Sequence, residues 1–134
     1  MILVDTNVLL DLVLEDPTWA DWSQHQLESA NIHHRLAINP VIYSELSIAF
    51  ARIEELERTL ADAALAFEPI PREALFLAGK AFLAYRRRRD GKQSVLPDFY
   101  IGAHAAIMGW TLLTRDAGRY RTAFPTVKLI APEN

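Results

Sequence analysis

The sequence predicts a single α/β domain over residues 1–134, with a parallel central sheet and helices on both faces. Short apolar runs without polar alternation are typical of strands buried on both faces. Segments with helical periodicity separate these runs, and strands that alternate with helices favour a parallel sheet with right-handed crossovers. The chain contains no long linker, internal repeat or low-complexity stretch, and its length suits one core rather than two.

In the first half of the chain, capping residues indicate where two of the helices begin. Asp16-Pro17 and Asn39-Pro40 each combine a helix-capping residue with a proline suited to the first helical position. The second helix should carry Trp19 and Trp22 inward. The expected elements are a strand at 2–4, helices at 8–14 and from 17 to about 31, a strand at 36–38, and a helix from 40 to about 50.

The second half continues the alternation. Apolar residues at helical spacing over a charged opposite face predict an amphipathic helix at 53–64. Asp90-Gly91 should end the long helix that follows. The expected elements are an extended segment at 67–70, a helix from 72 to about 88, a helix from 97 to about 108, and strands at 111–114 and 127–130.

Composition limits the cellular setting and leaves the substrate open. Cysteine is absent, which excludes disulfides and cysteine-ligated zinc, and no apolar run reaches the ~18 residues of a membrane span. We therefore expect a cytoplasmic protein without a membrane partner. The net charge of −3 argues against a nucleic-acid binder. If four acids share one metal site, however, the remaining charge is 14 − 13 = +1, which permits an anionic polymer as substrate.

Two acids follow buried strands. Asp5 ends the first strand, and Asp116 lies just beyond the strand that ends at Thr114. Open α/β sheets bind ligands at the carboxyl ends of their strands. Each acid also has a purely structural interpretation, because Asp5 could cap the following helix and Asp116 could belong to a turn before Gly118.

Two further acids lie on helix faces that should point toward the core. Glu45 shares its face with Val41 and Ile42, and a buried carboxylate without a partner is costly. Asp98 shares a face with Ile101, although its place in a first helical turn is explained equally well by the helix dipole. A solvated edge position remains the alternative for Glu45.

Together the four acids Asp5, Glu45, Asp98 and Asp116 can converge on one crevice. Packed carboxylates repel one another unless a cation neutralises them. Oxygen ligands without cysteine or paired histidines suit Mg²⁺ or Mn²⁺, and such an ion can activate water and stabilise charge on a phosphodiester. The neutral oxygens of Thr6, Asn7 and Thr114 could orient the acids.

The ordered set Asp5-Thr6-Asn7, Glu45, Asp98 and Thr114-Arg115-Asp116 spans nearly the whole chain and resembles a PIN domain. At this length the resemblance is to the stand-alone VapC-type toxin of a toxin–antitoxin pair. The resemblance implies a PIN-like nuclease domain, metal-dependent endoribonuclease activity on RNA, a homodimer, and a cognate antitoxin. It also implies that the four acids are the catalytic metal ligands and that Thr114, Thr6 and Asn7 support them.

Other charged residues are harder to place. Asp11 is interpreted as a solvated helix acid, and the four histidines as surface or core residues. A basic run is a candidate for RNA binding, although basic residues at a helix C-terminus also complement the dipole. The possible RNA-binding residues are Arg86, Arg87, Arg88, Arg89, Lys92 and Arg115.

Two rival functions stay open. A haloacid-dehalogenase-like phosphatase also has an acid after its first strand, but it needs a second Asp where this chain has Asn7. A non-catalytic RNA-binding or interaction module would need no metal, and the chain lacks a glycine-rich phosphate loop. RNA and a small phosphate ester, each offered with and without metal, would separate the three functions.

Overall fold

A five-stranded parallel sheet forms the centre of the protein. The structure is a computed structural model that describes residues 1–88 and 95–132, and the statements below concern that part of the chain. The strand order is β3-β2-β1-β4-β5, so the order reverses at β1, where open α/β sheets bind their ligands. The strands are β1 (Ile2–Val4), β2 (Leu36–Ile38), β3 (Leu65–Phe67), β4 (Thr111–Leu113) and β5 (Leu129–Ile130).

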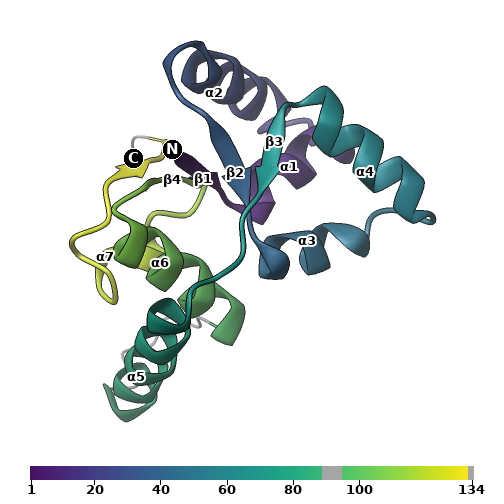
Figure 1. The fold of residues 1–134 in the computed structure, drawn as a ribbon. Coiled ribbons are helices and arrows are strands. Elements are labelled where there is room, and N and C mark those ends of the chain that lie inside the picture. Colours follow the sequence, from purple (N-terminus) through teal and green to yellow (C-terminus); the bar gives the residue numbers. More distant parts are fainter. Residues whose placement is uncertain (89–94, 133–134) are drawn as a thin grey trace.

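Helices cover both faces of the sheet, as the sequence predicts. Right-handed crossovers place the helices that precede β3 on one face and those that follow it on the other. In Figure 1, α6 and α7 accordingly lie on the opposite side of the strands from α4. The helices of the described chain are α1 (Thr6–Val13), α2 (Ala20–His33), α3 (Pro40–Ser47), α4 (Ile53–Asp62), α5 (Arg72–Arg88), α6 (Leu96–Met108) and α7 (Gly118–Arg121).

The three central strands are buried on both faces. Leu3 and Val4 of β1 and Leu112 and Leu113 of β4 are fully buried, which explains their unbroken apolar runs. β1 pairs with β4 in register, with Val4 opposite Leu113. The residues that follow these two strands are therefore brought together at one edge of the sheet.

Helix α6 is fixed by a close approach to the C-terminal segment. A Cβ on Gly102 would lie 2.3 Å from Cδ2 of Phe124, a separation that no folded side chain tolerates. Glycine is therefore required for this packing. The contact sets the position of α6, and with it the first turn that carries Asp98.

Several predicted boundaries are corrected by local hydrogen bonds. The second helix begins at Ala20 rather than at Pro17. The Asp16 side chain accepts the N–H groups of Thr18 and Trp19, both at 2.9 Å, and its carbonyl accepts the N–H of Ala20 at 3.0 Å, so Asp16 caps a turn that precedes the helix. In place of the extended segment expected at 67–70, a strand lies at Leu65–Phe67 and pairs with β2. Helix α7 was not predicted, and α3 is shorter than expected. None of the helices in the described ranges is long and apolar enough to cross a bilayer.

Candidate active site

Asp5 lies at the junction of β1 and α1, where it caps the helix as one of its two interpretations predicts. As the N-cap of α1 it accepts the N–H of Thr6 at Oδ1, at 2.8 Å. Its Oδ2 accepts the hydroxyls of Thr114 and Tyr120, each at 2.8 Å, and the amide of Asn7 at 3.4 Å. The residue is only 2% exposed, so these groups replace water around the carboxylate.

The hydrogen bonds do not fully replace the lost hydration. Burial raises the pKa of Asp5 to about 6, against the opposing effect of the hydroxyls of Thr114 and Tyr120, and the negative charge of Asp98 raises it further. Burial also raises the pKa of Tyr120 well above its usual value, so its hydroxyl stays a donor. The carboxylate of Asp5 therefore lacks a compensating positive charge.

Asp98 enters the same region from the first turn of α6. Its Oδ2 accepts the backbone N–H of Val95 at 3.3 Å, which satisfies the helix N-terminus as the dipole interpretation predicts. Its Oδ1 lies 3.5 Å from Nη1 of Arg119. Burial raises the pKa of Asp98, although the charge of Arg119 lowers it in part.

Asp116 follows β4 and shares the same arginine. Its Oδ2 lies 2.7 Å from Nε of Arg119, and its backbone N–H donates to Oγ1 of Thr114 at 3.0 Å. The hydroxyl of Thr114 thus connects the loop of Asp116 to the carboxylate of Asp5. The Asp116 side chain is 47% exposed, which makes it the most accessible of the three aspartates.

Glu45 joins the group through Thr6. The Oγ1 of Thr6 donates to Oε1 of Glu45 at 2.6 Å, while the backbone N–H of the same residue donates to Asp5. The half-buried Glu45 extends from α3, so its predicted place near the core face is partly met. The structure therefore links all four predicted acids through Thr6, Thr114 and Arg119.

Sequence reasoning found the acids and missed two of their partners. Thr6, Asn7 and Thr114 contact the acids as expected, and Asn7 Oδ1 also accepts the backbone N–H of Arg115 at 3.1 Å. Tyr120 and Arg119 were not predicted, because both lie on the four-residue helix α7, which is too short to give a periodic signal.

The sequence model of the PIN-domain family matches residues 2–125. This chain belongs to the PIN-domain family. Among solved structures, the fold is similar to Rickettsia felis VapBC2 bound to promoter DNA, at 20% identity and a TM-score of 0.75 over 98% of each chain. It is also similar to a Klebsiella pneumoniae toxin–antitoxin complex, at 21% identity and a TM-score of 0.68 over 100% of this chain and 99% of the other.

A third similar structure is the FitAcB complex of Neisseria gonorrhoeae, at 20% identity and a TM-score of 0.69 over 97% of this chain and 96% of the other. A search of curated proteins gives no significant match. At these identities the structural likeness establishes the fold, while the family match establishes membership among PIN domains.

One charged residue of this PIN domain was interpreted wrongly. Asp11 is not a solvated acid but is only 2% exposed. Arg115 donates from Nε and Nη2 to its two carboxylate oxygens, each at 2.9 Å, and Ser23 donates to Oδ2 at 2.7 Å. The guanidinium of Arg115 also lies 5.3 Å from the ring centroid of Trp19. An RNA contact by Arg115 stays a prediction, although its guanidinium is already bound.

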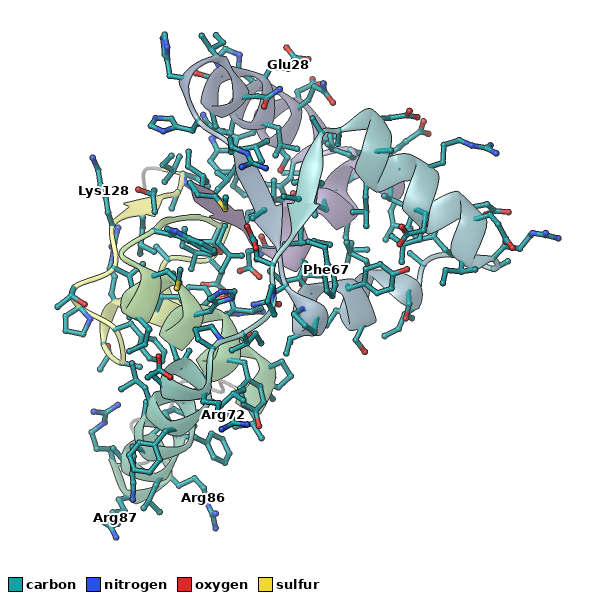
Figure 2. All side chains as sticks on the ribbon, in the orientation of Figure 1. Glu28, Phe67, Arg72, Arg86, Arg87 and Lys128 are labelled. Carbon is teal, nitrogen blue, oxygen red and sulfur yellow. The ribbon has the colours of Figure 1, made fainter. Side chains whose placement is uncertain are left out.

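The described part of the basic run lies at the C-terminal end of α5. Arg86, Arg87 and Arg88 are exposed in the last turn of α5, and Figure 2 shows Arg86 and Arg87 at the end of that helix farthest from the sheet. Arg89 and Lys92 fall outside the described residues. The position of Arg86, Arg87 and Arg88 in the last turn of α5 agrees with the helix-dipole interpretation. RNA binding by the basic run stays a prediction.

His104 belongs to the core, as one of the two interpretations of the histidines expected. It is fully buried, its ring lies 4.9 Å from that of Trp110, and its Nδ1 lies 3.2 Å from Nδ2 of Asn39. Burial lowers the pKa of His104, so the ring is held neutral.

The side-chain oxygens gathered at the candidate site of this PIN domain are of the kind that binds a hard divalent cation. Carboxylate and hydroxyl oxygens are the ligands that Mg²⁺ and Mn²⁺ prefer, and two of the acids are buried with raised pKa values. Within the described ranges, no three Asp, Glu, His or Cys side chains are already arranged around a common point. The reason is visible in the contacts, because Arg119 holds Asp98 and Asp116 while Thr6 holds Glu45.

Proposed function

We propose that this PIN domain is a metal-dependent endoribonuclease and the toxin of a toxin–antitoxin pair. The observation that carries the proposal is a pair of buried, mutually repelling carboxylates, Asp5 at the carboxyl end of β1 and Asp98 in the first turn of α6. Carboxylates of raised pKa that lie close together are typical of sites that bind a cation. Membership in the PIN-domain family and the similarity to toxin–antitoxin complexes support the same function.

The proposed metal ligands are Asp5, Glu45, Asp98 and Asp116. A bound Mg²⁺ or Mn²⁺ would supply Lewis acidity toward water and the phosphodiester. The protein supplies orientation: Thr114 and Tyr120 fix one oxygen of Asp5, and Thr6 fixes both Asp5 and Glu45. Such preorganisation contributes because Asp5 and Glu45 are already held in place before substrate binds.

The proposed partners are RNA, a second copy of the chain and an antitoxin. Several large apolar side chains on and beside α3 and α4 face solvent, including Ile48 at 88% exposure and Ile53 at 64%. Patches of this kind are typical of surfaces that bind protein. Expression of the chain without its antitoxin should arrest growth, whereas Asp5→Asn should relieve the arrest. Undiminished toxicity of that variant would remove Asp5 from catalysis.

The decisive test is cleavage of a labelled RNA by purified protein in Mg²⁺, Mn²⁺ or EDTA. Wild-type protein should cleave RNA only with metal, and Asp98→Asn should lose the activity. The matched control is Asp62→Asn, which removes the same charge from an exposed position at the end of α4 and should stay active.

Two parallel arms address the alternatives. Hydrolysis of a small phosphate ester without RNA cleavage would favour the haloacid-dehalogenase-like phosphatase. RNA binding that leaves the RNA intact in every metal would favour the non-catalytic module. Cleavage that persists in excess EDTA, with metal content verified as nil, would refute metal dependence.

A further inference from the structure

Arg119 lies among the acids of the candidate active site. Its Nε is 2.7 Å from Oδ2 of Asp116, and its Nη1 is 3.5 Å from Oδ1 of Asp98. Burial lowers the pKa of Arg119, but the charges of Asp98, Asp116 and Asp5 outweigh this effect and raise it. One guanidinium thus interacts with three of the four proposed metal ligands.

Only one of the two ion pairs of Arg119 is local in the sequence. The pair with Asp116 is local, at a spacing of three residues, but the pair with Asp98 joins α7 to the first turn of α6. A guanidinium carries fixed donors that can bridge two carboxylates, and it stays charged at every physiological pH. Its side chain is 43% exposed, so it can turn toward solvent without breaking the core.

We propose that Arg119 is the resident counter-ion of the acids and sets their metal affinity. Its guanidinium holds Asp98 and Asp116 near each other in the metal-free protein, and it leaves both when a divalent cation binds. This inference rests on the proposed metal-dependent function. It adds that the chain carries its own competitor for the metal.

Removing the competing charge should tighten metal binding. A metal ion must displace Arg119 from two partly exposed ion pairs, and their combined loss corresponds to roughly a factor of ten in an equilibrium constant. Arg119→Gln also leaves Asp98 and Asp116 repelling each other, which a metal ion would then relieve. We therefore expect Mn²⁺ to bind Arg119→Gln about tenfold more tightly than wild type.

The test measures Mn²⁺ dissociation constants by the electron paramagnetic resonance of the free ion. Arg121→Gln is the matched control, because it removes the same charge from the same helix at an exposed position. Its affinity should equal that of wild type. Arg119→Lys keeps the charge but lacks the bridging fork, so its affinity should lie between wild type and Arg119→Gln. Thermal melts in EDTA and in excess Mn²⁺ should show a lower metal-free Tm and a larger metal-induced rise for Arg119→Gln.

A second readout uses wild-type protein and does not depend on whether a variant folds. In a Mg²⁺ titration followed by nitrogen NMR, the Nε–H signal of Arg119 should shift with the midpoint of metal binding, while that of Arg115 should not. Equal Mn²⁺ affinity of wild type and Arg119→Gln, or an unmoved Arg119 signal, would overturn the role of Arg119 alone. Absence of Mn²⁺ binding to every protein, including wild type, would instead overturn the proposed metal-dependent function.

Discussion

Asp5→Asn should stabilise the metal-free protein at neutral pH, against the usual outcome for a buried residue. The change preserves the shape of the side chain and removes its charge. The amide oxygen can still accept the N–H of Thr6, and its NH₂ can donate to the hydroxyls of Thr114 and Tyr120, which both donate and accept. The variant therefore imitates the protonated form of Asp5.

The magnitude follows from the pKa. Burial raises the pKa of Asp5 from 3.8 to about 6, and each pKa unit is worth about 1.4 kcal/mol. Because the folded pKa lies above the unfolded one, the folded protein holds this proton more tightly. The contribution of Asp5 is fully present below about pH 4 and is lost as pH rises through about 6. The loss is about 3 kcal/mol, or on the order of 10 °C in Tm for a domain of this size.

The assay is a set of thermal melts in EDTA from pH 4 to pH 8 for wild type, Asp5→Asn and the exposed control Asp62→Asn. The Tm difference between Asp5→Asn and wild type should be near zero at pH 4 and should reach its full value above pH 6. Groups that do not interact with Asp5 are common to the proteins and cancel in the difference, whereas the repulsion between Asp5 and Asp98 is part of the effect measured. If Asp5→Asn melts below wild type at pH 7.5, or if the Tm difference between them does not change with pH, the charge of Asp5 is already compensated.

Two further predictions concern residues that contact buried acids, and a third concerns the basic run. Arg115→Ala should destabilise the protein by about 3 kcal/mol in urea unfolding, because it leaves Asp11 buried and unpaired, and the added change Asp11→Ala should recover part of the loss. An equal loss of unfolding free energy in the single and double variants would contradict this expectation. Tyr120→Phe should lower stability by about 1 kcal/mol and move the pH midpoint of the Asp5 effect upward, since one donor to its carboxylate is lost. Replacing Arg86–Arg88 with Ala should raise the Michaelis constant for RNA and flatten the salt dependence of binding, whereas unchanged binding across a salt series would leave only the helix-dipole role.

The strands and most helices were predictable because their signals are local. The runs around Leu3 and Leu112 lack polar alternation, and burial on both faces is the physical cause of that pattern. Asn39 followed by Pro40 gave the start of α3 correctly, with the Asn39 side chain accepting the N–H of Ile42 at 2.9 Å. The same signal failed at Asp16, where the side chain bonds to Thr18 and forms a turn. Sequence alone does not decide between the two, because both satisfy the same backbone donors.

The four acids of the candidate site could be predicted from the sequence. The side chains that donate hydrogen bonds or positive charge to them could not. Asp5 and Asp116 were identified because strand ends meet at one edge of a parallel sheet, which is a property of topology. Tyr120 reaches Asp5 across 115 positions in the chain, through a helix of four residues. No periodicity could indicate such a contact, because it depends on how α7 packs after the core has formed.

The two arginines that follow β4 show why a list of charges does not define a site. Arg115 and Arg119 are four positions apart, yet Arg115 neutralises Asp11 and Arg119 interacts with Asp98 and Asp116. Once Arg115 and Asp11 cancel, Arg119 is the one cation that forms an ion pair with the four predicted acids in the part of the chain that the structure describes. That ratio leaves the acids uncompensated when all are ionised, which agrees with the raised pKa values of Asp5 and Asp98. The same pairing removes Asp11 from the set of possible ligands, because its two oxygens are already bound by one guanidinium. The uncompensated charge therefore belongs to the four acids that the sequence pattern selected, and a divalent cation would offset most of it.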